Sequence, residues 1–220
     1  MRELRVILAV FVLVALASVF LGCEEEEFEE PPSQADWTRM GWDAWTTGDF
    51  DNAIRYFGNA IKVDENYMPA FNGLGWTFMR LQDTATSVNY FEDGVLYGAA
   101  YADSDADKRG LYVGLTYALE AADDFGGAIA AGETYLAMDP PPESPGDNRG
   151  TWKHPYDERL TAYDAYIILA VCYFAKGYPN KCVDTVHYMQ RKINETPEYQ
   201  FTNWSALAAK IEDMADKDPS

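Results

Sequence analysis

A chain of 220 residues, 48% of them hydrophobic, is long enough to bury one compact core. Its charge is strongly acidic, with 36 Asp and Glu against 17 Lys and Arg and a formal net charge of −19. This balance excludes nucleic acid and anionic lipid as partners of the general surface, because both repel an acidic protein. The three cysteines and two histidines form no cluster with metal-site spacing, so we expect no metal and no other cofactor.

Residues 1–22 have the pattern of a signal peptide. Two arginines are followed by an almost wholly apolar run at 6–21, which is shorter than the roughly 20 residues of a membrane-spanning helix. The run ends at Gly22-Cys23, and this junction resembles the lipobox of bacterial lipoproteins. The resemblance implies that residues 1–22 are removed and that Cys23 is lipidated. Cys23 then anchors the chain to a membrane of the bacterial cell envelope, inner or outer. The alternatives are an uncleaved membrane anchor and an ordinary secretory signal.

Residues 23–33 follow as an acidic segment. Six of the seven residues from 24 to 30 are glutamates, and two prolines come next. Glutamates at this density repel one another and cannot bury a core. We therefore predict an extended, disordered tether between the lipid anchor and the folded part of the chain.

From residue 34 onwards the sequence repeats with a period of 34. The first unit carries Trp37, Gly41 and Phe57, and the second carries Phe71, Gly75 and Phe91 at the equivalent positions. Small residues allow two antiparallel helices to approach closely, and the large rings fill the space between successive hairpins. With Trp, a Leu-Gly-like pair, a turn and a small–aromatic–small pattern, the unit resembles the tetratricopeptide repeat.

The resemblance implies an all-α fold over residues 34–217. This fold is a right-handed superhelical array of about four helical hairpins with a C-terminal capping helix. The repeats are expected at about 34–67, 68–101, 107–142 and 163–196, and the capping helix at 203–216. The expected helices lie near 35–47, 51–63, 68–81, 84–97, 106–121, 126–138, 158–176, 180–193 and 203–216. No alternation of apolar and polar residues predicts a strand.

The third repeat differs from the first. Val113-Gly114 is matched to the Leu-Gly pair, which leaves two extra residues before Phe125 and predicts a distorted turn. The Pro-rich loop at 139–156 then separates this repeat from the fourth. Long loops in compact domains are functional or disordered. This one ends with Trp152, His154 and Tyr156, which can bind a partner or pack back onto the array.

Two further features concern chemistry. Cys172 and Cys182 fall on paired helices, so an oxidising envelope predicts a disulfide between them. The alternative is two buried small residues at helix-contact positions. Cys182 can also be written into a Cys–His–Asp set with His187 and Asp184, but it occupies a buried position of the repeat. We therefore expect no catalytic site and no enzyme activity.

The tetratricopeptide resemblance also implies a concave ligand groove lined by the first helix of each repeat. The candidate binding residues are Trp42, Trp45, Asn72, Trp76, Met79, Arg80, Leu115, Ile167 and Phe174. We expect a protein or peptide ligand there, which makes the chain a membrane-tethered scaffold or assembly factor. The alternative ligand is envelope polysaccharide or peptidoglycan, because aromatic rings stack on sugars. A further alternative is that the 139–156 loop, through Trp152, or a second copy of the chain fills the groove. The oligomeric state is left open.

Overall fold

The computed structural model describes residues 30–98 and 105–219, with the side chains of 105–107 excepted. The expected signal peptide at 1–22, the lipidation residue Cys23 and the tether up to residue 29 lie outside the described residues. The chain divides into two units, Met1–Pro31 and Pro32–Ser220, and the fold described below is that of the second. Among the described residues, no helix is both long and apolar enough to cross a membrane.

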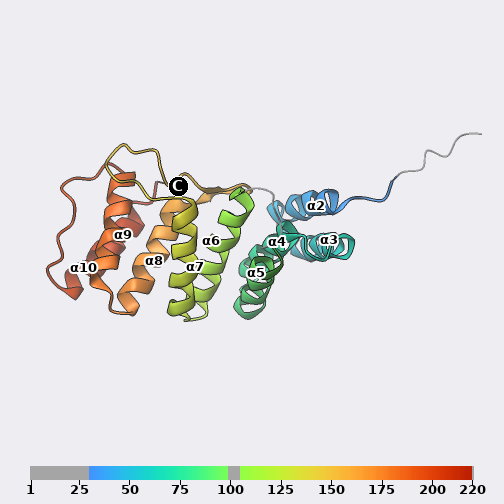
Figure 1. The fold of residues 1–220 in the computed structure, drawn as a ribbon, viewed down its shortest axis with the longest axis horizontal. Helices are drawn as coiled ribbons and strands as arrows, with labels where there is room; N and C mark the ends of the chain where they lie inside the picture. The colour runs from blue at the N-terminus through green and yellow to red at the C-terminus, as the bar shows by residue number, and fades with distance from the viewer. Residues whose placement is uncertain (1–29, 99–104, 220) are drawn as a thin grey trace, which may run out of the picture. The chain divides into compact units, whose positions relative to one another are not determined.

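The described residues form an array of helical hairpins in chain order (Figure 1). The helices are α2 (Gln34–Thr46), α3 (Phe50–Val63), α4 (Met68–Arg80), α5 (Thr84–Gly98), α6 (Asp105–Ala121), α7 (Phe125–Met138), α8 (Ala162–Ala175), α9 (Pro179–Lys192) and α10 (Trp204–Asp216). Helices α2 to α9 pair as four hairpins, each packed on the next, and α10 packs on both α8 and α9. The predicted all-α repeat array with a C-terminal capping helix is confirmed.

Side chains at the helix starts fix where several helices begin. The Ser33 hydroxyl accepts from the Asp36 N–H, and the Asp36 carboxylate accepts from the Ser33 N–H, at 3.2 and 3.1 Å. Asp49, Asp124 and Asn203 cap α3, α7 and α10 in the simpler way, each accepting one backbone N–H of the first turn. These bonds satisfy amide groups that have no partner inside the helix.

The turn inside each hairpin has one residue in the left-handed conformation. These residues are Gly48, Gln82, Asp123 and Gly177, with φ of 79°, 60°, 60° and 72°. Each stands two residues before the second helix of its hairpin, so the third turn is regular and the predicted distortion is wrong. The turn also corrects the alignment of the third repeat. Leu115-Thr116 is the counterpart of Leu74-Gly75, and Val113-Gly114 lies two positions earlier.

Aromatic rings seated against glycines join each hairpin to the next. The Phe57 ring of α3 lies against Gly41 of its own hairpin and Gly73 of the following one. Phe91 of α5 repeats the arrangement in the next two hairpins, and both rings have no exposed surface. Any side chain at these glycines would overlap the rings, so the absence of a Cβ sets the spacing between hairpins.

One predicted helix start is wrong. Residues 158–161 were expected to open a helix, but they belong to β2 (Asp157–Thr161), which pairs antiparallel with β1 (Lys153–His154). Helix α8 begins only at Ala162, because Thr161 caps it. The Thr161 hydroxyl accepts from the Tyr163 N–H at 3.1 Å, and the Asp164 carboxylate accepts from the Thr161 N–H at 2.8 Å.

The predicted disulfide is also wrong. Cys172 of α8 and Cys182 of α9 are both buried free thiols. The Cys182 Sγ donates to the Ala170 carbonyl at 3.3 Å, and burial raises the pKa of each thiol to about 12. Both thiols therefore stay protonated near neutral pH. The alternative interpretation, two small buried residues at helix contacts, describes what the structure shows.

Two glycine substitutions test the ring–glycine packing. In Gly75→Ala the new Cβ would stand 2.5 Å from the Phe91 ring, which predicts a loss of about 1–3 kcal/mol in the free energy of unfolding. Gly58→Ala in α3 is the control, because nothing lies within 4 Å of its Cβ. We expect it to gain about 0.5–1 kcal/mol from helix propensity alone. Urea denaturation of the two variants measures the difference, and equal midpoints would contradict the packing argument.

Candidate functional site

The first helices of the four hairpins place equivalent residues on one face, which we call the groove face. With the corrected alignment, its two rows are Trp42, Trp76, Tyr117 and Val171, and Trp45, Met79, Glu120 and Phe174. The prediction that Leu115 lines the groove is wrong. Like its counterpart Leu74, it is a buried core residue. Tyr117 was missed, and the constant distance between the Leu-Gly pair and the second helix would have found it.

The N-terminal part of the groove face is not open. His154, at the end of β1, lies among three tryptophans, with ring centroids 5.4, 5.5 and 4.8 Å from those of Trp42, Trp45 and Trp76. Tyr156 stacks on Trp42 at 4.4 Å with 11° between the ring planes. The three tryptophans are consequently only 3–4% exposed. The prediction that these tryptophans line an open groove is wrong, and so is the inclusion of Asn72, which is also buried.

An ion pair fixes the same segment at its second strand. The Asp157 carboxylate of β2 lies 3.3 Å from Arg80 of α4 and accepts two hydrogen bonds from the Arg159 guanidinium, each of 2.8 Å. The hydrogen bond from Arg159 is the largest influence that lowers the pKa of Asp157, and Arg80 acts in the same direction. The Arg80 guanidinium also lies over the Trp45 ring, 5.0 Å from its centroid. Arg80, which was predicted to contact a ligand, is thus neutralised by Asp157 of the same chain.

Strands β1 and β2 form a β-hairpin at 153–161, and its base is held by Asp139 at the end of α7. Its carboxylate accepts from the N–H groups of Thr151 and Trp152 at 3.2 and 2.9 Å and from the Tyr135 hydroxyl at 2.9 Å. The Ala162 N–H donates to the Trp152 carbonyl at 2.9 Å, where the chain enters α8. The alternative that the Pro-rich loop fills the groove is confirmed in outline. Trp152 holds the base, while the side chains in the groove are those of His154 and Tyr156.

Several ring N–H groups between the β1–β2 hairpin and the groove face lack a hydrogen-bond acceptor among the described residues. The Nδ1 atom of His154 accepts from the Tyr156 N–H at 3.2 Å, so the proton lies on Nε2. Among the described residues, that Nε2 and the Nε1 atoms of Trp45 and Trp76 have no acceptor. Burial is the main cause that lowers the pKa of His154 to about 4, with Asp157 opposing and Arg80 assisting. His154 is therefore neutral near pH 7.

The C-terminal end of the groove face differs, because it carries an open pocket. The pocket measures about 310 Å³ and lies between α8 and α10. It is lined by Ile167, Val171, Phe174, Ala208, Ile211, Glu212 and Ala215. Trp204, which is 40% exposed, packs edge-on against Phe174 at 5.2 Å, and Phe201 packs against Trp204 at 5.9 Å. The structure therefore brings the predicted residues Ile167 and Phe174 together in an accessible apolar site.

Met79 and Arg80, the remaining predicted residues, line a pocket of about 410 Å³ beside the β1–β2 hairpin, together with Tyr117 and Leu160. The Cys–His pair considered from the sequence is not assembled. His187 Nε2 lies 2.8 Å from the Tyr199 carbonyl, while the Cys182 thiol faces the Ala170 carbonyl. His187 thus fixes the segment between α9 and α10.

Comparisons with known proteins agree with this fold. Residues 37–67 match the family model of the tetratricopeptide repeat. No curated protein matches the chain. Among solved structures, "YrrB: a TPR protein with an unusual peptide-binding site" has a TM-score of 0.57 at 14% identity, with 90% of each chain covered. A structure of MamA has a TM-score of 0.56 at 21% identity, covering 84% of this chain and 85% of that one.

A chain of the Cut9–Hcn1 hetero-tetramer of the APC/C is also similar to this chain, but it is much longer. Its TM-score is 0.58 at 15% identity, covering 86% of this chain and 30% of that one. The present chain thus spans less than a third of that chain's length. At these identities the likeness shows the fold alone.

Acidification tests the burial of His154. The docked histidine has a pKa of about 4, against about 6.5 for a free one. Docking is therefore complete above about pH 6.5 and is weakened as the pH falls toward 4, by about 3 kcal/mol in all. We expect faster hydrogen exchange of the 153–161 amides at pH 5 than at pH 7, after correction for intrinsic rates.

His154→Phe is the control for this measurement, because it keeps a ring in the site and removes the titration. The Asp164 carboxyl at the base of the β-hairpin titrates over the same pH range, but its effect on the stability of docking has the opposite sign. Burial is the main cause that raises its pKa to about 6, so its contribution improves as the pH falls. An equal change in exchange for the wild-type chain and His154→Phe would show that His154 is not the responsible group.

Proposed function

We propose that this chain, a tetratricopeptide-repeat protein, is a membrane-tethered scaffold that binds a protein or peptide partner at the open end of its groove face. The observation that supports this most is the pocket between α8 and α10. Its walls are aliphatic and aromatic except for Glu212, and its volume accommodates a large side chain of a partner. YrrB, a protein of the same fold, has a peptide-binding site, and a ligand of this kind supports the proposal for the present chain.

Exposed rings extend the apolar surface beyond the pocket. Phe201 and Trp204 are 43% and 40% exposed, and they continue the surface from Phe174. Contiguous apolar patches on a soluble domain mark interaction sites, and tryptophan is enriched among the residues that dominate binding energy. The patch therefore supplies an anchor of the kind that a polypeptide partner uses.

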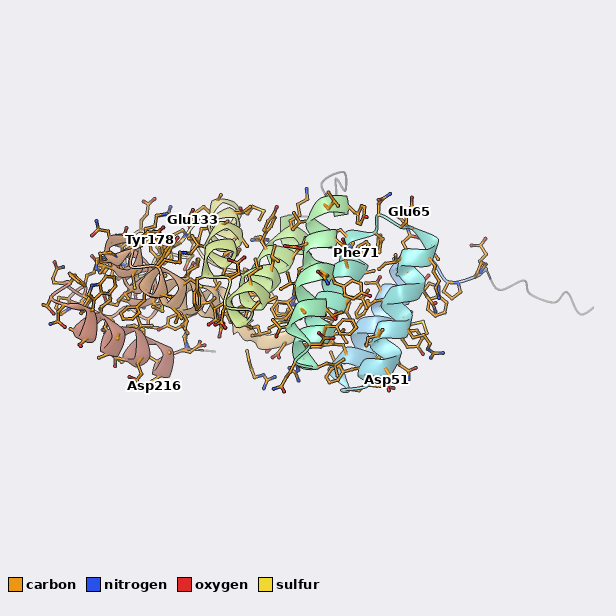
Figure 2. All side chains as sticks on the ribbon, turned by 90° about the horizontal axis from the view of Figure 1, so that it is seen from below. Asp51, Glu65, Phe71, Glu133, Tyr178 and Asp216 are labelled. Atoms are coloured by element: carbon orange, nitrogen blue, oxygen red, sulfur yellow. The ribbon has the colours of Figure 1, made fainter. Side chains whose placement is uncertain are left out.

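Charge indicates what surrounds the anchor residue of the partner. Glu212 lies in the pocket wall, and the Lys210 ammonium nearby is already paired with Glu195 and Asp213. Exposed acids such as Asp51, Glu65, Glu133 and Asp216 lie along the rest of the array (Figure 2). A partner segment with a large apolar residue beside Lys or Arg matches this surface, because complementary charge steers association and selects against acidic competitors.

The tether completes the proposal. A lipid on Cys23 would hold the chain at a membrane of the bacterial cell envelope, and the run of glutamates after it would be repelled by anionic lipid. The folded array would then stand away from the surface with its pocket accessible. We do not propose glycan binding, because the aromatic groove that suggested it is covered by His154 and Tyr156.

Binding at the pocket is tested by Ala208→Glu. Ala208 is exposed and lines the pocket, so a glutamate side chain there occupies the apolar mouth without disturbing the core. It blocks entry of the partner's large apolar residue, and this loss outweighs the added attraction for Lys or Arg. Short random peptides selected on the wild-type chain should combine a large apolar residue with Lys or Arg. Their affinity for Ala208→Glu should fall by about tenfold or more. Leu96→Glu on α5, where the leucine is 66% exposed, is the control and should bind normally. Equal loss in both variants would rule out the pocket.

The membrane anchor is tested at Cys23. We expect mass spectrometry of the membrane-extracted protein to show a diacylated N-terminal cysteine and no residue from 1–22. Cys23→Ser should leave the protein unlipidated with its leader uncut, because the modification requires the thiol. An N-terminus that retains residues before 23 in the wild-type protein would contradict the proposal.

A further inference from the structure

The covered part of the groove face has the composition of a binding surface. Trp42 and Trp45 of α2 with Trp76 and Arg80 of α4 place three indole rings and a guanidinium side by side, and we call this set the tryptophan surface. Each of these side chains contacts the hairpin at 153–161. Tryptophan and arginine are the residue types most enriched at interface hot spots. Their burial here depends on a separate nine-residue segment that can be considered as a ligand.

The hairpin engages the tryptophan surface through three side chains. The imidazole of His154 lies between the indoles, the Tyr156 ring stacks on Trp42, and the Asp157 carboxylate pairs with Arg80. These three residues lie within four consecutive positions of the chain, His154 to Asp157. The surface therefore accommodates a short segment with two rings at alternate positions and a carboxylate directly after the second ring.

The fit of this internal segment is incomplete. The indole N–H groups of Trp45 and Trp76 and the Nε2–H of His154 find no acceptor among the described residues. Tyr156 is still 41% exposed although it stacks on Trp42. Buried donors without acceptors weaken an association. A partner segment that keeps both rings and also presents a carbonyl oxygen to these indoles would pair them and bind in preference.

The hairpin can leave without unfolding the helices. Asp139 holds Trp152 on one side, and the Thr161–Asp164 capping box holds the start of α8 on the other. Between these fixed points the sheet has only two strands, with an irregular register between Lys153 and His154. Two-stranded sheets are marginally stable on their own. The tip at 153–161 therefore depends on its contacts with the tryptophan surface.

We infer that residues 153–161 are an internal pseudo-ligand, and that the tryptophan surface binds a segment of a partner protein with aromatic residues at alternate positions followed by an acid. The inference rests on the proposed partner-binding function and adds a second site to it. The tethered hairpin competes at a high effective concentration. A partner already anchored in the pocket between α8 and α10 overcomes this competition, because its own segment is then held close by.

The test uses a labelled peptide with the sequence of residues 151–162 and the full chain. The triple variant His154→Ser, Tyr156→Ser, Asp157→Ser removes the side chains that fill the surface and leaves the helices unchanged. We expect the peptide to bind this variant about tenfold or more tighter than the wild-type chain. Lys153→Ser with Glu158→Ser, two exposed hairpin residues, is the matched control and should bind like wild type. No binding to a folded triple variant would overturn the inference.

A second measurement does not depend on the stability of the triple variant. Excess peptide added to the wild-type chain should raise hydrogen exchange at 153–161, while a peptide with the tyrosine and following aspartate replaced by serine should not. Unchanged exchange at every peptide concentration would also overturn the inference. Ala208→Glu should leave both results unchanged, so a failure here is distinguishable from a failure of the pocket between α8 and α10.

Discussion

The contact of a phenylalanine ring with two glycines controls the rest of the array. Phe57 touches Gly41 and Gly73, and Phe91 touches Gly75 and Gly114, so each ring joins one hairpin to the next. Because the rings have no exposed surface, the helix spacing has little freedom. This spacing places Trp42 and Trp76 in one row of the groove face, where both reach His154. The site is therefore a consequence of the core.

The groove face has two parts with different chemistry. Near α2 and α4 it is aromatic, carries Arg80 and is covered by a segment of the same chain. Near α8 and α10 it is aliphatic, carries Glu212 and is open. A partner that uses both parts would present an apolar, basic stretch and an aromatic, acidic stretch. Such a division gives selectivity, because each part rejects the charge that the other accepts.

The sequence predicted what is periodic and missed what is not. Equivalent small and large residues 34 positions apart identified the first two helical hairpins, and the repeat pattern identified the other two. Ile167 and Phe174 do line a pocket. The third repeat was misaligned because Gly114 resembles the glycine of the Leu-Gly pair, whereas Thr116 occupies that position. The β1–β2 hairpin was missed because β1 has only two residues. The hairpin is held in place by Trp42, more than 100 positions away. No local pattern records such a contact.

The same long-range contacts change how the array is expected to fold. Repeat proteins are quasi-one-dimensional: each unit touches its neighbours, and the ends unfold independently. Here Arg80 and Asp157, 77 positions apart, join the second hairpin to the segment that leads into the fourth, and Tyr156 reaches the first. This brace closes a large loop in the chain, which costs entropy during folding and slows it. While the segment is docked, it couples the stability of the first two helical hairpins to that of the fourth, and this coupling ends when the segment leaves the groove face.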